Sequence, residues 1–211
     1  MLENNITEIF NNPNIIKKIQ EKLPYLFQMA EVDNSRDGKL GMEIGSARER
    51  ILIALLIHEF GEGNIKTNIP ITQTEADVIV FEKPISIKTM THKKIIGVKL
   101  IWTVDAQKSL EFIDNYQAEC DMIFVHINWL NLGGVYFIPK QAQAEILQIV
   151  GKSNYFKLPK QGTNPRGVEI TTDALVTLTQ HRLTQKIDIT WNRGNILQYT
   201  PYQRWIDLWQ S

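Results

Sequence analysis

The chain has 211 residues and a mass of 24.4 kDa, and its 23 basic and 23 acidic side chains give a formal net charge of zero. This length suits a single domain over 1–211 with a sizeable hydrophobic core. A hydrophobic content of 43% and a charged content of 22% exclude wholesale disorder and a collagen-like fold. The balanced charge excludes a polyanion binder that acts through net charge alone.

The charge is unevenly distributed along the chain. Residues 1–77 carry 8 basic and 12 acidic side chains, a net of −4, whereas 78–211 carry 15 and 11, a net of +4. Five lysines and no acid lie between Lys83 and Lys99, and 140–166 holds five basic residues and one acid. Two solvated faces would account for this pattern, and so would a phosphate-binding surface beside an acidic pocket.

The lack of recognisable targeting segments and the single cysteine are typical of a cytoplasmic protein. The amino terminus lacks the basic and apolar segments of a signal peptide, and the longest apolar run, 51–57, is far too short to span a membrane. Cys120 is the single cysteine, so neither an intramolecular disulfide nor a multi-cysteine zinc site can form. We expect a cytoplasmic protein with no membrane partner.

The first part of the chain predicts helices. Residues 5–30 have a helical apolar pattern that Pro13 interrupts, and a polar, glycine-bearing loop is expected over 31–45. Ser46 and Glu49 have the spacing of a capping box, which predicts a helix over 47–60 that ends at Gly61.

The rest of the chain alternates strands and helices, which suggests an α/β core on a mixed sheet. Strands over 75–81 and 85–89 are close enough in sequence to pair as a hairpin. The remaining predicted elements, in chain order, are an apolar segment over 95–102, a helix over 104–116, a strand over 121–129, a turn at Gly133-Gly134, a strand over 135–138, a helix over 140–150, a short helix over 173–180 and an aromatic-rich tail over 187–210.

The predicted hairpin holds the residues that most clearly suggest a catalytic function. Asp77 lies at the start of one strand, and Ser86 and Lys88 lie in the next, on a common face because strand side chains alternate. Carboxylates suit Mg²⁺, and a lysine beside the ion can orient water and stabilise charge on a phosphoryl oxygen. A surface hairpin with a solvated lysine is the plainer alternative, since this spacing recurs by chance.

These residues resemble a known superfamily. Asp77, eight intervening residues and then Ser86-Ile87-Lys88 look like the PD-(D/E)xK nuclease signature, and the runs at 45–52 and 162–170 are similar to segments of type II restriction endonucleases. The resemblance covers most of 45–170. It implies an α/β fold with a restriction-endonuclease-like mixed β-sheet core flanked by helices, here preceded by a helical segment and followed by a DNA-recognition or dimerisation region.

The sequence departs from the superfamily signature at two positions. Ala76 replaces a proline, and Ser86 replaces the second acid. Some restriction enzymes with serine there supply the missing carboxylate from a helix, which makes Glu49 the leading candidate, ahead of Asp105 and Glu111. Glu75 is two residues from Asp77 and in a regular strand shares its face, so it is also a candidate metal ligand.

The resemblance implies Mg²⁺-dependent hydrolysis of phosphodiesters in double-stranded DNA by a type II restriction enzyme. Asp77 would bind Mg²⁺, Glu49 would bind it directly or through water, Lys88 would hold the attacking water, and Ser86 would be a weak or water-mediated ligand. A two-fold homodimer suits the cutting of both strands of a palindromic site.

DNA contacts are harder to assign than the catalytic residues. The basic, loop-like region after 158 and the turn after the catalytic strand hold the candidates, because base edges need Arg, Lys, Asn or Gln and phosphates need charge. They are Lys93, Lys94, Lys160, Asn164, Arg166 and Arg182. For Arg166, a surface turn held by Pro165 and Gly167 is an equal alternative.

Two other functions remain compatible with the sequence. One is a non-catalytic DNA-binding module whose metal site Ser86 has spoiled, and the other is a different nuclease of the same superfamily. The C-terminal tryptophans are expected in the core, or in a dimer interface if they are exposed.

Overall fold

A computed structural model describes residues 5–36, 39–41, 43–69, 75–101, 103, 105–158, 167–194, 200 and 202–210. A six-stranded mixed sheet lies at its centre, in the order β11-β8-β7-β5-β4-β3. The strands are β3 (Ile65–Lys66), β4 (Val78–Val80), β5 (Lys83–Thr91), β7 (Asp121–Ile127), β8 (Leu132–Ile138) and β11 (Gln185–Thr190). Strands β5 and β7 are parallel and the other neighbours antiparallel, so the predicted α/β mixed sheet is confirmed.

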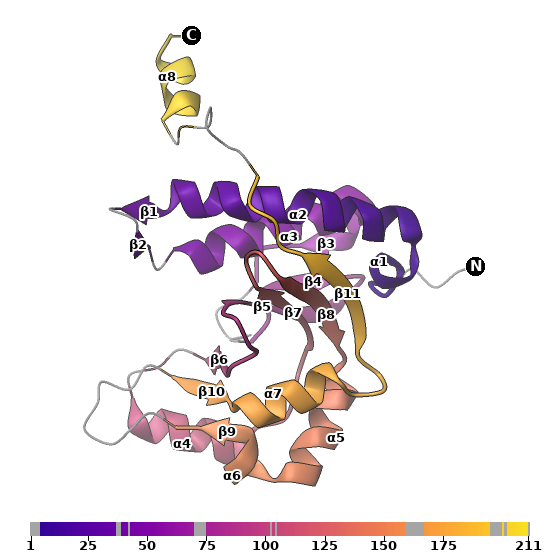
Figure 1. Cartoon of the computed structure of the whole chain (residues 1–211). Helices are drawn as coiled ribbons and strands as arrows, with labels where there is room; N and C mark the ends of the chain where they lie inside the picture. Colours follow the sequence, from indigo (N-terminus) through magenta and orange to yellow (C-terminus); the bar gives the residue numbers. More distant parts are fainter. Residues whose placement is uncertain are drawn as a thin grey trace.

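Three N-terminal helices cover one face of this sheet (Figure 1). They are α1 (Glu8–Asn11), α2 (Pro13–Asp33) and α3 (Ile44–Phe60). Helix α2 buries Ile15, Ile19, Leu23 and Phe27, one residue per turn, against alternate side chains of the strands. Burial of this apolar stripe is the main force that holds the helices to the sheet.

A second layer covers the opposite face, and it includes a small three-stranded sheet (Figure 1). That sheet has the order β6-β10-β9, with β6 (Val98–Ile101), β9 (Phe156–Lys157) and β10 (Val168–Ile170). The helices of this layer are α4 (Ala106–Asn115), α5 (Lys140–Val150), α6 (Lys152–Tyr155) and α7 (Thr172–Thr179). Side chains alternate along β7, so Ile123 and Val125 join the first core while Met122 and Phe124 join the second.

The region between the first two long helices differs from the prediction. Helix α2 continues to Asp33, and a short hairpin of β1 (Ser35–Arg36) and β2 (Lys39–Leu40) follows where a loop was expected. Helix α3 begins at Ile44 with Glu43 in the N-cap position, so Ser46 lies inside its first turn and the predicted capping box is wrong. The helix does end at Gly61, whose φ of 82° suits glycine.

Gly133 and Gly134 lie inside β8 and do not form the predicted turn. A Cβ on Gly133 would overlap the carbonyl oxygen of His126, and one on Gly134 would lie 2.7 Å from that of Ile187. The two glycines therefore permit close strand packing, a role that local sequence does not distinguish from a turn.

Two of the tryptophans in the C-terminal tail have opposite environments. Trp191 follows β11 and is fully buried beside Phe27, as the sequence led us to expect. Helix α8 (Gln203–Gln210) extends away from the body of the molecule (Figure 1), and its Trp209 is 91% exposed. In the described part of the chain, no helix is long and apolar enough to cross a lipid bilayer.

Candidate active site

The β4–β5 hairpin holds Asp77 in a fixed orientation. The backbone N–H of Asp77 donates to the carbonyl of Ile85 at 2.9 Å, and Asp77 Oδ2 accepts from the N–H of Ile87 at 2.6 Å and from Ser86 Oγ at 3.4 Å. Within the described part of the chain, Ser86, Ile87 and Lys88 all contact this carboxylate through Oδ2. Oδ1 is therefore the oxygen that can bind a cation.

Lys88 lies beside this carboxylate, as the alternation along the strand predicted. Its Nζ is 3.5 Å from Asp77 Oδ2, and the two side chains are 19% and 23% exposed. Ser86 lies on the same face and is buried, with its hydroxyl directed at Asp77. The structure thus brings Asp77, Ser86 and Lys88 together, and Lys88 is not the solvated surface lysine of the plainer alternative.

Glu49 approaches the pair from the N-terminal half of α3. It is half-buried, and its pKa is raised first by burial and then by the negative charge of Asp77, with Lys88 and Arg50 opposing the shift. The two carboxylates are close enough for their charges to interact, although they are 28 positions apart in the sequence. The helix therefore brings a second acid near Asp77 and Lys88.

Glu75 lies further into the protein, near Lys88 and Cys120. Burial, followed by the charge of Glu119, raises its pKa to about 7, while Lys88 and hydrogen bonds from Glu119 and Cys120 lower it. The Cys120 thiol is 3.9 Å from Glu75 Oε2, and its own pKa rises to about 12 because of burial and then the charge of Glu75. Lys88 thus has acids on either side, which together exceed its single positive charge.

A cavity of about 490 Å³ opens beside Glu49 and Lys88. Lys99 of β6 and Glu169 of β10 also line it. These two residues are cross-strand partners, and Glu169 also faces Lys157 of β9, whose Nζ is 3.3 Å from Glu169 Oε2. Sequence reasoning assigned no role to Glu169 and placed Lys99 only in a lysine-rich run, because the pairing of 98–101 with 168–170 has no local signal.

The donor set at this site fits a hard divalent cation. Among the described residues, no group of three or more His, Cys, Asp or Glu side chains is arranged as a metal cage. Mg²⁺ usually binds to one or two carboxylates and takes its other ligands from water and substrate phosphate. Asp77 and Glu49 are such a pair, and their interaction is unfavourable without a cation between or beside them.

Comparison with known proteins decides which nucleases this chain resembles. A family model described as restriction endonuclease ThaI matches residues 9–211. A solved structure titled as a restriction endonuclease in complex with substrate DNA is 52% identical, with a TM-score of 0.90 over 97% of this chain and 98% of that chain. A search of curated proteins gave no match. This chain belongs to the ThaI restriction endonuclease family.

Membership of the ThaI family makes the chain a sequence-specific, type II DNA endonuclease with a restriction-endonuclease fold. The resemblance to type II restriction enzymes is thereby confirmed. Restriction endonucleases generally use divalent metal ions, which agrees with the acid pair at the cavity. The alternative of a non-catalytic module on the same fold loses its support, because the helix supplies a carboxylate beside Asp77.

The other acids considered from the sequence lie elsewhere in this ThaI family member. Asp105 is the N-cap of α4, where its carboxylate accepts from the N–H groups of Gln107 and Lys108. Glu111 is exposed on the same helix and accepts from the side chain of Gln107. Neither residue lines the cavity that holds Glu49 and Lys88.

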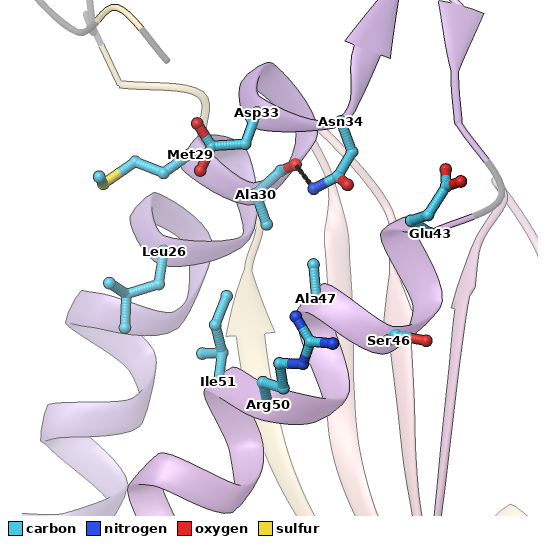
Figure 2. A pocket seen from close by; sticks show the side chains of 10 residues that line it. All are labelled: Leu26, Met29, Ala30, Asp33, Asn34, Glu43, Ser46, Ala47, Arg50 and Ile51. Atoms are coloured by element: carbon cyan, nitrogen blue, oxygen red, sulfur yellow. Dashed lines mark hydrogen bonds between the residues drawn. The ribbon is translucent and has the colours of Figure 1, made fainter. Parts of the chain in front are cut away.

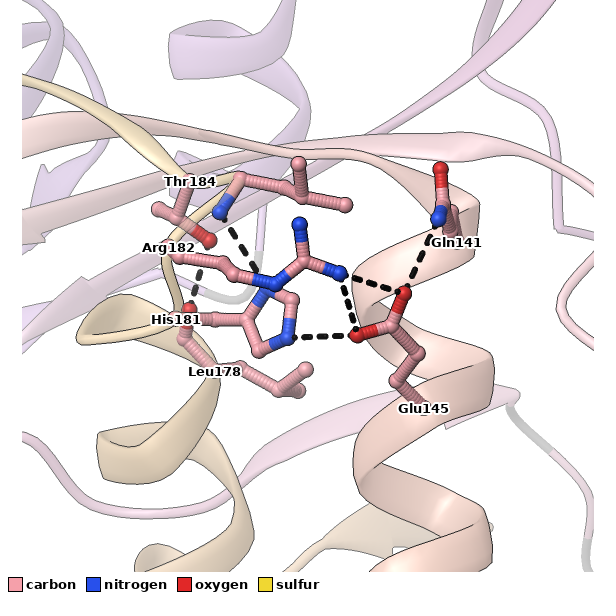
Figure 3. Close-up of polar contacts among 7 residues, drawn as sticks. Gln141, Glu145, Leu178, His181, Arg182 and Thr184 are labelled. Carbon is pink, nitrogen blue, oxygen red and sulfur yellow. Dashed lines mark hydrogen bonds and ion pairs between the residues drawn. The ribbon is translucent and has the colours of Figure 1, made fainter.

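The predicted DNA contacts have three different locations. Lys93 and Lys94 are exposed in the turn that directly follows β5. Lys160, Asn164 and Arg166 lie outside the described residues. Arg182 lies in the turn between α7 and β11, where it pairs with Glu145 of α5 at 3.2 Å beside His181 (Figure 3).

A buried ionic cluster next to the site was not predicted. Arg48, the neighbour of Glu49, points into the core and donates to Glu31 at 2.6 Å; both side chains are about 5% exposed. Glu31 also accepts from Trp129 Nε1 at 2.8 Å and from Arg193 at 2.9 Å. This cluster joins α3 to α2, to the β7–β8 turn and to the C-terminal tail, and so fixes the helix that carries Glu49.

Proposed function

We propose that Asp77, Glu49 and Lys88 are the catalytic residues of a Mg²⁺-dependent endonuclease acting on double-stranded DNA. The observation that carries this proposal is the position of Lys88 Nζ, 3.5 Å from a carboxylate that already raises the pKa of Glu49. Two neighbouring carboxylates and one lysine, beside a cavity that Lys99 also lines, match the needs of phosphodiester hydrolysis.

Each residue has a distinct part in the proposed mechanism. Asp77 and Glu49 would hold the cation with carboxylate oxygens, and Glu75, whose pKa is raised to about 7, is a further candidate ligand. Ser86 and the N–H of Ile87 keep the Asp77 carboxylate in place through Oδ2. When bound, Mg²⁺ would neutralise phosphate charge and lower the pKa of water.

Lys88 acts on the substrate side of the same cluster. Its ammonium donates hydrogen bonds to a non-bridging oxygen of the scissile phosphate and orients the attacking water, while its interaction with Asp77 limits its motion. Charge that develops on the phosphate is thus stabilised by a group that is in place before the reaction.

DNA binding and assembly complete the proposal. Lys93, Lys94 and Lys160 contact phosphates, and Asn164, Arg166 and Arg182 are candidates for base or backbone contacts, with Arg182 first having to leave Glu145. We infer a homodimer, because two active sites related by a two-fold axis cut both strands of a palindromic site. The enzyme works in the cytoplasm, where DNA is accessible and the free thiol of Cys120 is stable.

Incubation of the purified protein with phage DNA tests this function. We expect discrete fragments with Mg²⁺ and intact DNA with Ca²⁺ or with chelator. The variant Lys88→Ala should be inactive and should still bind DNA, whereas Lys66→Ala, which alters an exposed lysine paired with Glu82, should cleave normally. Cleavage by Lys88→Ala at the wild-type rate would contradict the assignment.

A further inference from the structure

Helix α8 presents an apolar surface that the rest of the chain leaves exposed. Tyr202, Ile206 and Trp209 are spaced by four and three residues, so they lie along one side of the helix. Their exposed fractions are 69%, 43% and 91%, and Leu208 is 60% exposed. Trp209 is the most exposed large hydrophobic side chain among the described residues. Clustered exposure of this kind marks an interaction site.

The point at which this tail leaves the body is fixed. The side chain of Gln28 on α2 forms two hydrogen bonds with the backbone of Gly194, at 2.9 and 3.1 Å, and the adjacent Arg193 is bound to Glu31 and stacked on Trp129. Beyond this clamp, α8 stands away from the α2–α3 pair (Figure 1). The helix is therefore carried outward from a rigid attachment on α2.

A groove between α2 and α3 offers a matching surface. Two adjoining cavities of about 600 and 340 Å³ share Leu26 and Ile51 as lining residues (Figure 2 shows the larger). Leu26 is 37% exposed, and the smaller cavity is otherwise lined mainly by aliphatic side chains of the two helices. Grooves between paired helices accept an amphipathic helix whose anchors are spaced by three or four residues.

We propose that α8 of one copy docks in the α2–α3 groove of a second copy, and that two copies exchange this helix reciprocally. The inference rests on the homodimer of the proposed function and names the surfaces that form it. The structure already shows α8 away from its own groove, and a two-fold partner presents the same groove and the same helix, so the exchange closes without further assembly.

The area that can be buried favours this occupant. Tyr202 and Trp209 are 69% and 91% exposed, so most of each side chain is available to be covered. An aromatic side chain buries about 150–250 Å². Two arms with two aromatic anchors each, counted with the grooves that receive them, reach roughly the 1,200–2,000 Å² of a stable interface.

The molar mass of variants in solution tests whether α8 and the α2–α3 groove form the dimer interface. We expect a dimer for the wild-type protein, and a loss of at least about 100-fold in dimer affinity for Ile206→Arg/Trp209→Arg in α8 and for Leu26→Arg in the groove. Ile149→Arg is the matched control, because Ile149 is 75% exposed on α5, and it should stay dimeric.

Cross-linking separates a partner's groove from the chain's own. Protein with Leu26→Cys is mixed with protein carrying Trp209→Cys and treated with a short bis-maleimide; Cys120 is buried and is left in place. A covalent dimer from the mixture supports exchange. An intrachain link in the double variant, with no product from the mixture, would show that α8 docks on its own chain and would overturn the inference.

Two outcomes distinguish failure of this inference from failure of the proposed function. A dimer that survives both the α8 and the Leu26 variants overturns helix exchange and leaves the homodimeric nuclease intact. A monomeric wild-type protein that cleaves both strands at full rate overturns the homodimer as well as the exchange, and leaves the catalytic residues unaffected.

Discussion

Consecutive residues of α3, Arg48 and Glu49, belong to two carboxylate clusters whose electrostatic balance differs. In the first, Glu31 is buried and accepts from Arg48, Arg193 and Trp129, so both of its oxygens are satisfied by the protein. In the second, Lys88 contacts Asp77, and Glu49 and Glu75 add negative charge around it. We call the first the closed cluster, because cations of the chain balance its acid, and the second the open cluster, because it has an excess of negative charge.

This difference separates structure from catalysis. A buried charge with full compensation stabilises one arrangement of the chain, and removal of a partner leaves an unpaired ion in the core. Like charges that lie close together destabilise the free protein, and a cation relieves that cost. Arg48 and Glu49 are consecutive residues, so one turn of helix contributes to both clusters.

The largest effect is expected on catalysis, from the open cluster. Asp77→Asn or Lys88→Ala should lower the rate of DNA cleavage by about 10³-fold or more, because each removes a group that stabilises the transition state. Single-turnover cleavage with saturating Mg²⁺ measures the loss. Denaturation of Asp77→Asn should show stability equal to or above that of the wild type, because one of several neighbouring negative charges is removed. A large loss of stability in this variant would instead give Asp77 the structural role that Glu31 has.

Removal of one partner from the closed cluster should act on stability. Arg48→Met leaves Glu31 short of a buried donor, and we expect a loss of about 3–5 kcal/mol in the free energy of unfolding. Urea denaturation measures it. The control Lys66→Ala breaks an exposed pair with Glu82 and should cost less than about 1 kcal/mol. Equal costs for the two variants would contradict the distinction between the clusters.

The raised pKa of Glu75 should make the free energy of unfolding depend on pH. A carboxyl with a raised pKa stabilises the folded state below its unfolded pKa of 4.5, and that contribution is lost as the pH rises through its folded pKa, which is about 7 for Glu75. The metal-free protein should therefore lose roughly 2 kcal/mol between pH 4.5 and pH 8 from this residue, after allowance for solvent screening. Glu75→Gln should flatten the curve, and a wild-type curve unchanged by this substitution would contradict the shift.

The smallest effect is expected from Lys99 and Lys157, the two lysines on the strands that flank Glu169. Lys99→Ala or Lys157→Ala should weaken DNA binding by a similar factor for specific and non-specific sequences. Each should lower the slope of log K against log salt by about one if the lysine contacts a phosphate. Fluorescence anisotropy at several salt concentrations in Ca²⁺ measures this, and an unchanged slope would remove these lysines from the DNA surface.

Much of the fold was predictable, because the apolar patterns that indicate its helices and strands lie within short stretches of sequence. Apolar periodicity identified α2, α5 and both strands of the hairpin, and alternation along β5 placed Ser86 and Lys88 on one face with Asp77. The start of α3 was wrong because Glu43 takes the N-cap position, and the Gly133-Gly134 turn was wrong because close strand packing also requires glycine.

The two clusters differ in how far the sequence could show them. Asp77 and Lys88 are eleven positions apart on paired strands, so strand geometry sufficed, and the proximity of Glu49 was expected through the family resemblance. The bond between Glu31 and Arg193 spans 162 positions and depends on how the tail crosses α2. The cavity wall of Lys99 and Glu169 likewise depends on the pairing of β6 with β10. These contacts depend on tertiary packing, so no periodic pattern in the sequence predicts them.

Direct measurement of metal binding tests the central claim that the open cluster holds a divalent cation. Calorimetric titration of Ca²⁺, which leaves the DNA intact, into the protein–DNA complex should show binding in the wild type, and a loss of at least about tenfold in affinity in Asp77→Asn and in Glu49→Gln. Glu145→Gln, which alters an exposed acid paired with Arg182, should bind as the wild type does. Equal affinity in Asp77→Asn, Glu49→Gln and the wild type would contradict the account.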